Sequence, residues 1–301
     1  MIENMYNDFK WPVPVGETTM PKWCGNYFTL TSGSNSGVLI CNDSNSNWSD
    51  DLTLLHEAEA GQGDHPIDQA SRELAIRSLR DHLADSSSVI MDVGCSSGFL
   101  LSDIKRSFPQ AALIGADYLT DLLLRLSQKM PQVPLLQFDL RKSPLETECI
   151  DAITCINVLE HIDDDRAALG EIYRMLKPGG IAHIEVPASP SCYDIYDEHL
   201  MHHRRYTMRE LSMKCQQAGF SILNKTHLGA LVFPAFYVVK KRNRKYLKCP
   251  KEVKSNMVKK MISQTRSSIL MRIISKAEME FGKYFSYPFG IRAVIVVQKY
   301  E

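Results

Sequence analysis

Short apolar runs alternate with amphipathic stretches through the middle of the chain. The runs read SVIMDV, AALIGA, PLLQF, IDAITCI and GIAHIEV, and each is largely apolar or β-branched. Such runs are typical of strands that are covered on both faces. The stretches near 98–107, 119–130 and 164–176 have helical spacing instead, and LKPGG ends the last of them. This alternation predicts a parallel sheet with helices on both sides.

Further elements extend this core at both ends. Pro66 stands where the first turn of a helix tolerates proline, and an apolar face continues from it to Ala84. A helix near 208–218 and a strand near 220–226 follow the last buried run, and IRAVIVVQK near the C-terminus predicts one more strand. The pattern therefore predicts seven strands in all.

Two regions lie outside this alternation. Residues 1–63 are rich in Gly, Ser, Asn, Asp and Pro, with scattered aromatic residues, and predict an irregular N-terminal lobe. Residues 228–288 combine helical patterning with many Lys and Arg residues. We therefore divide the chain into the N-terminal lobe (1–63), a core (64–227), a basic helical insertion that could act as a lid (228–288) and a last core strand (289–301). The lobe and the insertion are expected to enclose a ligand of the core.

Composition narrows the class of protein. With 301 residues and 44% hydrophobic content the chain can bury a large core, and a formal net charge of zero does not favour nucleic acid as a partner. Eight cysteines without a CxxC pair predict free thiols in a reducing compartment. The N-terminus lacks the pattern of a secretory signal, and the longest apolar run near the C-terminal third, 228–239, is too short to span a bilayer. We expect a cytoplasmic protein, and the sequence leaves its oligomeric state open.

The first predicted strand breaks into small residues in VIMDVGCSSGFL. Gly94 and Gly98 suit a sharp turn that lets a ligand approach the backbone. In an open doubly wound sheet this first strand-to-helix turn is where ligands bind. The spacing is not the GxGxxG of a nicotinamide site, which disfavours a dinucleotide.

Several motifs together identify a family. DVGCSSGFL resembles motif I of class I S-adenosylmethionine-dependent methyltransferases, an acid followed by GxGxG, with Ser96 in place of the middle glycine. GADYLTDLL and QFDLRKSPL resemble the family's next two segments. AITCINVLEHIDDD with EIYRMLKPGG is the most specific match. The resemblance covers about residues 86–226 and resumes in IRAVIVVQK, which it implies is antiparallel.

The resemblance implies a Rossmann-like doubly wound fold and a set of cofactor contacts. Asp117 would hold both ribose hydroxyls, since a carboxylate can accept two hydrogen bonds at once. Tyr118 would pack on adenine, Asp139 would accept from the adenine amino group beside Leu140, and Cys95 is a small spacer. The implied S-adenosyl-L-methionine contacts are Asp92, Gly94, Cys95, Ser96, Gly98, Asp117, Tyr118, Asp139, Leu140 and Asn157.

Histidines near the expected acceptor site are the candidate catalytic residues. His161 follows the fourth core strand, while His199 and His203 lie in DEHLMHHRRYT after the fifth. Histidine titrates in the range that suits a general base for a hydroxyl or ammonium acceptor. We expect His202 to be exposed, and Arg204, Arg205 and Tyr206 to have structural roles. A metal held by Glu160, His161 and this loop is conceivable, but no compact ligand motif demands one, so we predict none.

The basic segment 240–260 holds ten Lys or Arg and one acid, and it follows the apolar LVFPAFYVV. It could meet an anionic membrane surface or a phosphorylated or lipid-linked acceptor, or it could form a solvated helix pair over the site. The lid interpretation is favoured. No nucleic-acid-binding module is recognisable in the segment.

These observations predict a methyltransferase that acts on a small-molecule acceptor, with O-methylation in specialised (natural-product) metabolism as the leading hypothesis. S-adenosyl-L-homocysteine would be the product of the cofactor. Two alternatives stay open, namely a methyltransferase for a lipid-linked or quinone acceptor at a membrane surface and a cofactor-binding scaffold without catalysis.

Overall fold

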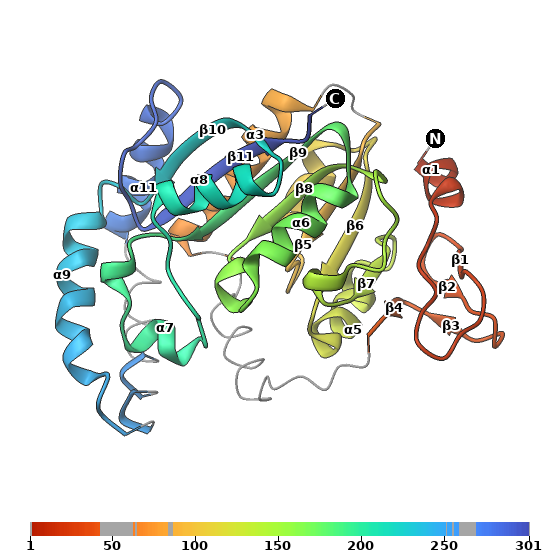
Figure 1. The fold of residues 1–301 in the computed structure, drawn as a ribbon, viewed down its shortest axis with the longest axis horizontal. Coiled ribbons are helices and arrows are strands. Elements are labelled where there is room, and N and C mark those ends of the chain that lie inside the picture. Colours follow the sequence, from red (N-terminus) through yellow and green to blue (C-terminus); the bar gives the residue numbers. More distant parts are fainter. Residues whose placement is uncertain are drawn as a thin grey trace.

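The computed structural model describes residues 2–42, 63, 65–83, 87–250, 252–254, 256–258 and 269–300. An eight-stranded sheet forms its centre, and helices cover both faces of the sheet (Figure 1). The strands lie side by side in the order β10 (Ser221–Leu228), β11 (Arg292–Gln298), β9 (Leu176–Pro187), β8 (Ile150–Ile156), β5 (Val89–Val93), β6 (Ala112–Asp117), β7 (Leu135–Gln137) and β4 (Val38–Ile40). The predicted doubly wound α/β fold is confirmed.

The sheet is mixed. β4 to β9 run parallel to one another, whereas β11 pairs antiparallel with both β9 and β10. Ile295 of β11 faces Ile184 of β9 and Lys225 of β10 in this register. The antiparallel last strand is therefore present as predicted.

The prediction of seven strands was wrong by one. Residues 38–40 leave the N-terminal region and extend the sheet edge, where Leu39 pairs with Leu136 of β7 in parallel register. A three-residue strand in a Gly- and Ser-rich segment is too short to show a period of two. Only the free edge of β7 identifies it as part of the sheet.

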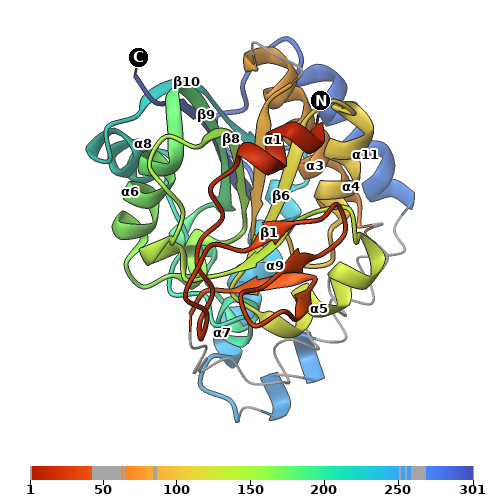
Figure 2. The same cartoon turned by 90° about the vertical axis from the view of Figure 1, so that its right-hand side faces the viewer.

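Two layers of helices sandwich the sheet, as Figure 2 shows. One hydrophobic cluster joins the sheet to α3, α4 and α5, and another joins it to α6 and α8. Alternate residues of β5 enter the two clusters, with Ile90 on one side and Met91 on the other. The helices begin and end within about two residues of the predicted bounds: α3 (Pro66–His82), α4 (Phe99–Ser107), α5 (Thr120–Lys129), α6 (Asp165–Met175) and α8 (Met208–Gln217).

The N-terminal segment is built into the core. It forms α1 (Ile2–Asp8) and a small sheet of β1 (Lys22–Trp23), β2 (Phe28–Thr29) and β3 (Asn35–Ser36). Tyr6, Trp11, Trp23 and Phe28 are buried in the same cluster as α6 and α8. The Tyr6 hydroxyl also donates to the carbonyl of Leu113 in β6 at 2.9 Å. These aromatic side chains therefore pack on the sheet; Trp48 lies outside the described residues.

Between β10 and β11 the described residues are mainly helical. They form α9 (Phe233–Asn243), η4 (Arg244–Tyr246) and α11 (Ile269–Phe281). α9 lies beside α7 (Ile195–His199) of the loop that follows β9 (Figure 1). None of the helices in the described ranges is long and apolar enough to cross a bilayer.

Candidate active site at the carboxyl edge of the sheet

The turn between β5 and α4 is a cradle of left-handed backbone. Gly94, Ser96 and Gly98 have φ values of 76°, 45° and 78°. A Cβ at Gly94 would lie 2.4 Å from Val158, and one at Gly98 would lie 2.4 Å from Leu126. Glycine is therefore required at both positions for shape as well as for conformation. Ser96 shows that the middle position also needs positive φ, which serine adopts at a cost.

Asp117 closes the cradle from the end of β6. Its Oδ2 accepts from the backbone N–H of Ser96 at 2.9 Å, and its Oδ1 accepts from the N–H of Leu119 at 3.0 Å. Desolvation raises the pKa of this carboxyl, while the backbone donors oppose the shift. A carboxylate has about four lone-pair sites, so acceptor capacity is left for a ligand diol.

Asp92 and Cys95 are buried beside the turn. Oδ1 of Asp92 accepts from the Thr154 hydroxyl at 2.7 Å, and burial raises the pKa of Asp92 to about 7. Burial also raises the pKa of the Cys95 thiol well above its usual range. A thiol held neutral is a poor nucleophile, in keeping with the spacer role expected for Cys95.

A cavity of about 150 Å³ opens next to the cradle. Asp92, Gly94, Cys95, Ser96 and Asn157 all line it, so the structure brings half of the predicted cofactor residues to one place. Arg292 of β11 reaches the same cavity. A larger cavity of about 290 Å³ lies between α3, β10 and α11 and contains none of the predicted site residues.

The three residues predicted to contact adenine stand beyond Asp117 along the same edge. Asp139 is the N-cap of η1 (Leu140–Lys142), and Arg141 binds both of its carboxylate oxygens, with Nε at 3.0 Å from each. This ion pair lowers the pKa of Asp139 against the effect of burial. Leu140 is buried in the core and Tyr118 is half-buried. The position of Asp139 suits the predicted contact, but Arg141 shares its oxygens.

Of the predicted catalytic histidines, His161 follows the cofactor turn residues most closely along the chain. It ends η2 (Leu159–His161), directly after β8 and Asn157. His203 is exposed, and its backbone N–H donates to the carbonyl of Glu160 at 2.8 Å. His199 ends α7 and is half-buried. His161 and His199 are therefore both half-buried, and only His203 is exposed.

His202 belongs to the site, although it was not among the predicted site residues. It was expected to be exposed, but it is only 7% exposed, and its ring packs edge-on against that of His161 with centroids 4.7 Å apart. Glu160, His161 and His202 each place one potential metal-ligand atom within 4.8 Å of the others. Burial raises the pKa of Glu160 to about 8. Asp197, five residues before His202, accepts from Nδ1 of His202 at 3.0 Å, a contact that only the fold of the loop creates.

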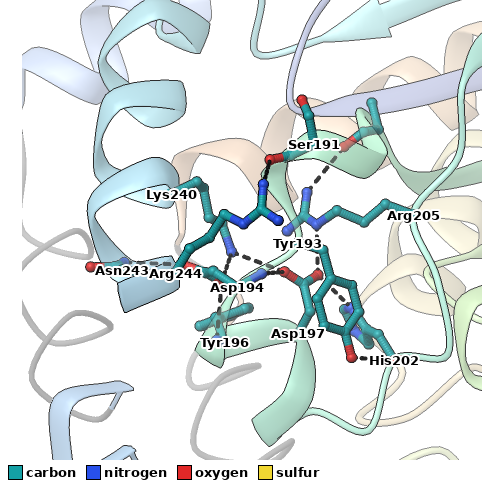
Figure 3. A network of polar contacts seen from close by, with 11 residues as sticks. Ser191, Tyr193, Asp194, Tyr196, Asp197, His202, Arg205, Lys240, Asn243 and Arg244 are labelled. Carbon is teal, nitrogen blue, oxygen red and sulfur yellow. Dashed lines mark hydrogen bonds and ion pairs between the residues drawn. The ribbon is translucent and has the colours of Figure 1, made fainter. Parts of the chain in front are cut away.

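A buried polar network fixes this loop (Figure 3). Asp197 accepts from Nε of Arg205 at 2.6 Å, and Nζ of Lys240 lies 2.7 Å from Asp194 and 3.4 Å from Asp197. Burial alone would raise the pKa of Asp197. The hydrogen bond from His202 and the charges of Arg205 and Lys240 outweigh this effect and hold the pKa well below its usual range. Lys240 is thus not part of a basic surface, as its run of Lys and Arg suggested, but an internal link from α9 to the loop.

Arg204 and Tyr206 complete the structural part of the motif. Tyr206 is fully buried, and its hydroxyl lies 2.8 Å from Oδ2 of Asp165. Arg204 pairs with the same carboxylate at 3.0 Å. The expected structural role of the Arg-Arg-Tyr segment agrees with these contacts.

Comparison with known proteins decides what kind of domain carries this site. Residues 91–184, from the middle of β5 to the middle of β9, match the family model described as a methyltransferase domain. This stretch is a class I methyltransferase domain. It includes the glycine turn, Asp117, and Glu160 with His161, whereas the loop with His202 and the insertion lie outside the match.

Two curated relatives with similar sequences are also named as methyltransferases. The chain is 32% identical over 127 residues to a trans-aconitate 2-methyltransferase of Azoarcus sp., covering 40% of this chain and 47% of that protein. It is 25% identical over 149 residues to a malonyl-[acyl-carrier protein] O-methyltransferase of Halalkalibacterium halodurans, covering 47% of this chain and 53% of that protein. The chain thus spans about half the length of these curated relatives.

A solved structure shows the same fold over a longer stretch. Phosphoethanolamine N-methyltransferase 2 of Haemonchus contortus, solved in complex with S-adenosyl-L-methionine, superposes with a TM-score of 0.54. The match covers 85% of this chain and 59% of that protein at 14% identity. At this identity the likeness concerns the fold of the methyltransferase domain and its flanks.

Proposed function

We propose that this protein transfers a methyl group from S-adenosyl-L-methionine to a small-molecule acceptor, with O-methylation in specialised metabolism as the reaction. The observation that carries the proposal is the cradle formed by Gly94, Ser96 and Gly98 with Asp117 across from it. The methyltransferase family match over the same residues supports the choice of cofactor.

The residues present fit this cofactor. Gly94 and Gly98 place no side chain on the turn, and the Asp117 carboxylate keeps lone pairs for the two ribose hydroxyls. Asp92 and Asn157 line the cavity beside the turn and would hold the amino-acid end. A cavity of about 150 Å³ takes only part of a ligand of this size, since sites for such molecules measure about 300 Å³ or more, so the remainder would lie along the open edge toward Asp117.

When bound, the cofactor supplies a methyl group on a sulfonium that is already activated for transfer. The task of the protein is then to hold the acceptor atom in line at near-attack distance and to exclude water. Asn157 and Val158 lead from the cradle to Glu160 and His161, and these polar groups would stand on the acceptor side of the site. Polar groups there suit an acceptor hydroxyl, and one curated relative is named as an O-methyltransferase.

Two measurements test the proposal in sequence. Isothermal titration with S-adenosyl-L-methionine and S-adenosyl-L-homocysteine should give micromolar binding at one site per chain. Transfer of labelled methyl groups to a panel of hydroxyl, amine and carboxylate acceptors should then identify the acceptor class. Absence of binding would refute the proposal, while binding without transfer to any acceptor would favour the scaffold hypothesis.

A second candidate acceptor is a lipid-linked or quinone molecule at an anionic membrane surface. The observation in its favour is that α9 and α11 expose apolar side chains close to exposed basic ones. The apolar members include Val238 at 56%, Val239 at 46%, Ile269 at 74% and Ile273 at 60% exposure, and the exposed basic residues of α9 include Lys241 and Arg242. Such a surface suits anionic lipid headgroups.

Vesicle flotation tests this second candidate. The intact protein should float with phosphatidylglycerol vesicles and not with phosphatidylcholine vesicles, and Lys241→Glu with Arg242→Glu should abolish flotation. Charge reversal at exposed positions is preferable to removal of the insertion, because Lys240 is part of the buried network. Equal recovery with both kinds of vesicle would leave the soluble small-molecule acceptor as the proposal.

A further inference from the structure

We propose that Glu160, His161 and His202 bind one divalent transition-metal ion beside the cofactor cradle. The three residues come from two segments that are distant in sequence, the η2 turn after β8 and the loop after β9. Their ligand atoms lie within 4.8 Å of one another. The atoms that bind a single first-row ion lie about 3 to 4.4 Å from one another. Small side-chain rotations that move these atoms by about 1 Å would therefore bring all three within reach of one ion.

The environment of the Glu160 carboxyl is the main evidence for a bound ion. The residue is fully buried, and neither of its oxygens has a hydrogen-bond partner among the described residues. Buried polar groups are almost always paired, so an orphaned carboxyl indicates an ion or water at its side. A carboxylate that bound a cation would exchange this orphaned state for a strong electrostatic contact.

The side chain of His202 is held in the orientation that a ligand needs. Its Nδ1 lies 3.0 Å from Oδ1 of Asp197, which leaves Nε2 for the ion. Carboxylate–histidine–metal triads of this kind fix the tautomer and the ring of metal-binding histidines. Arg205 and Lys240 in turn fix Asp197, so the whole network in Figure 3 serves as a rigid support for one ligand.

The donor set indicates the class of ion. Two imidazole nitrogens and one carboxylate oxygen suit Zn²⁺, Fe²⁺ or Co²⁺ more than Ca²⁺ or Mg²⁺, which prefer oxygen alone. His161 is partly exposed and provides a route for entry. What the ion would do rests on the proposed methyl transfer: open coordination positions would bind the acceptor oxygen and favour its ionised form. Its binding does not depend on that reaction.

Metal binding to the intact chain, without cofactor or acceptor, tests the inference. The protein is stripped with a chelator, and Zn²⁺ or Co²⁺ is titrated in competition with a chromophoric chelator. We expect one ion per chain and a visible Co²⁺ spectrum. Glu160→Gln, His161→Gln and His202→Gln should each weaken binding by about 100-fold. His203→Gln is the matched control, because its side chain is exposed next to the site, and it should bind as the parent does.

Several outcomes would overturn the metal site. Binding weaker than about 100 μM in the parent protein would do so, as would equal affinities in the Glu160→Gln and His203→Gln proteins, which would place the ion elsewhere. Should Glu160→Gln fail to fold, the partly exposed His161 gives a variant that decides the same question. Titration with S-adenosyl-L-homocysteine on the same samples separates the hypotheses: cofactor binding without metal overturns the metal site alone, and metal binding without cofactor overturns the proposed function alone.

Discussion

The backbone N–H of Ser96 donates to Oδ2 of Asp117 at 2.9 Å. Ser96, which replaces the middle glycine of the family motif, therefore contacts the acid that is expected to bind the ribose. Serine at a φ of 45° costs backbone energy of about 1 to 2 kcal/mol. A charge-assisted hydrogen bond to a carboxylate contributes a comparable amount in return. The hydrogen bond therefore offsets the cost of positive φ at Ser96, and the turn has the left-handed conformation that glycine usually supplies.

This relationship predicts which residues Ser96 can become. Ser96→Gly should retain S-adenosyl-L-homocysteine affinity within about 2-fold, because glycine adopts positive φ readily and keeps the N–H donor. Ser96→Val should weaken binding by about 10-fold or more, because a β-branched residue resists this conformation. Isothermal titration of both proteins checks the prediction, and equal affinity in the valine protein would show that the turn can relax without loss.

Asp117→Ala should weaken cofactor binding by about 10- to 100-fold, since the ligand loses a charged acceptor and the N–H groups of Ser96 and Leu119 lose theirs. Asp121→Ala is the matched control, because Asp121 is exposed in the first turn of the following helix. Titration with S-adenosyl-L-homocysteine and thermal melting should be measured together. An Asp117→Ala protein that binds as tightly as the parent would remove this residue from the site.

Lys240→Met should destabilise the fold by about 3 kcal/mol or more and lower the melting temperature by roughly 5 to 10 °C, because it removes the cation that pairs with the buried Asp194 and leaves Asp197 with the Arg205 cation. Lys241→Met changes an exposed neighbour on the same helix and should leave the melting temperature nearly unchanged. The double change Lys240→Met with Asp194→Asn should recover part of the loss. Identical melting of the two single variants would contradict the internal link.

His183 predicts a dependence of stability on pH. This histidine is fully buried in β9, and desolvation lowers its pKa to about 3. Between about pH 6.5 and pH 3 the unfolded chain therefore binds more protons than the folded one, so stability is present above pH 6.5 and is lost as the pH falls, with a slope approaching about 1.4 kcal/mol per pH unit from this group. Urea unfolding at pH 5, 6 and 7 should show a smaller slope for His183→Gln than for the parent. Equal slopes in the parent and the His183→Gln protein would contradict a neutral, buried His183.

The hydrophobic pattern was sufficient for the central strands and helices. A strand such as 89–93 is buried on both faces, so its composition identifies it without knowledge of its neighbours. β4 could not be found in this way, because three residues are too few to show an alternating hydrophobic pattern. Their strand is recognisable only from its pairing with β7. The aromatic residues near the N-terminus were visible, but nothing local showed that they pack on the sheet.

The glycine turn and Asp117, which are expected to hold the cofactor, were predictable to a similar degree as structural features. Gly94, Gly98 and Asp117 lie within single strand-to-helix turns, where residue type and backbone conformation are linked locally. His202 shows the opposite case. It stands next to the exposed His203, and it is buried beside Asp197, which Arg205 of the same loop and Lys240 of α9 also contact.

The sequence by itself determined the doubly wound core, its strand-to-helix turns and the family of the domain, because periodicity, small residues and short motifs act over a few neighbouring positions. Only the tertiary structure decided the extra edge strand, the burial of Lys240 and the meeting of Glu160, His161 and His202. These features depend on contacts between segments separated by tens of residues. The identity of a charged or polar residue does not show whether the fold will bury it beside a partner.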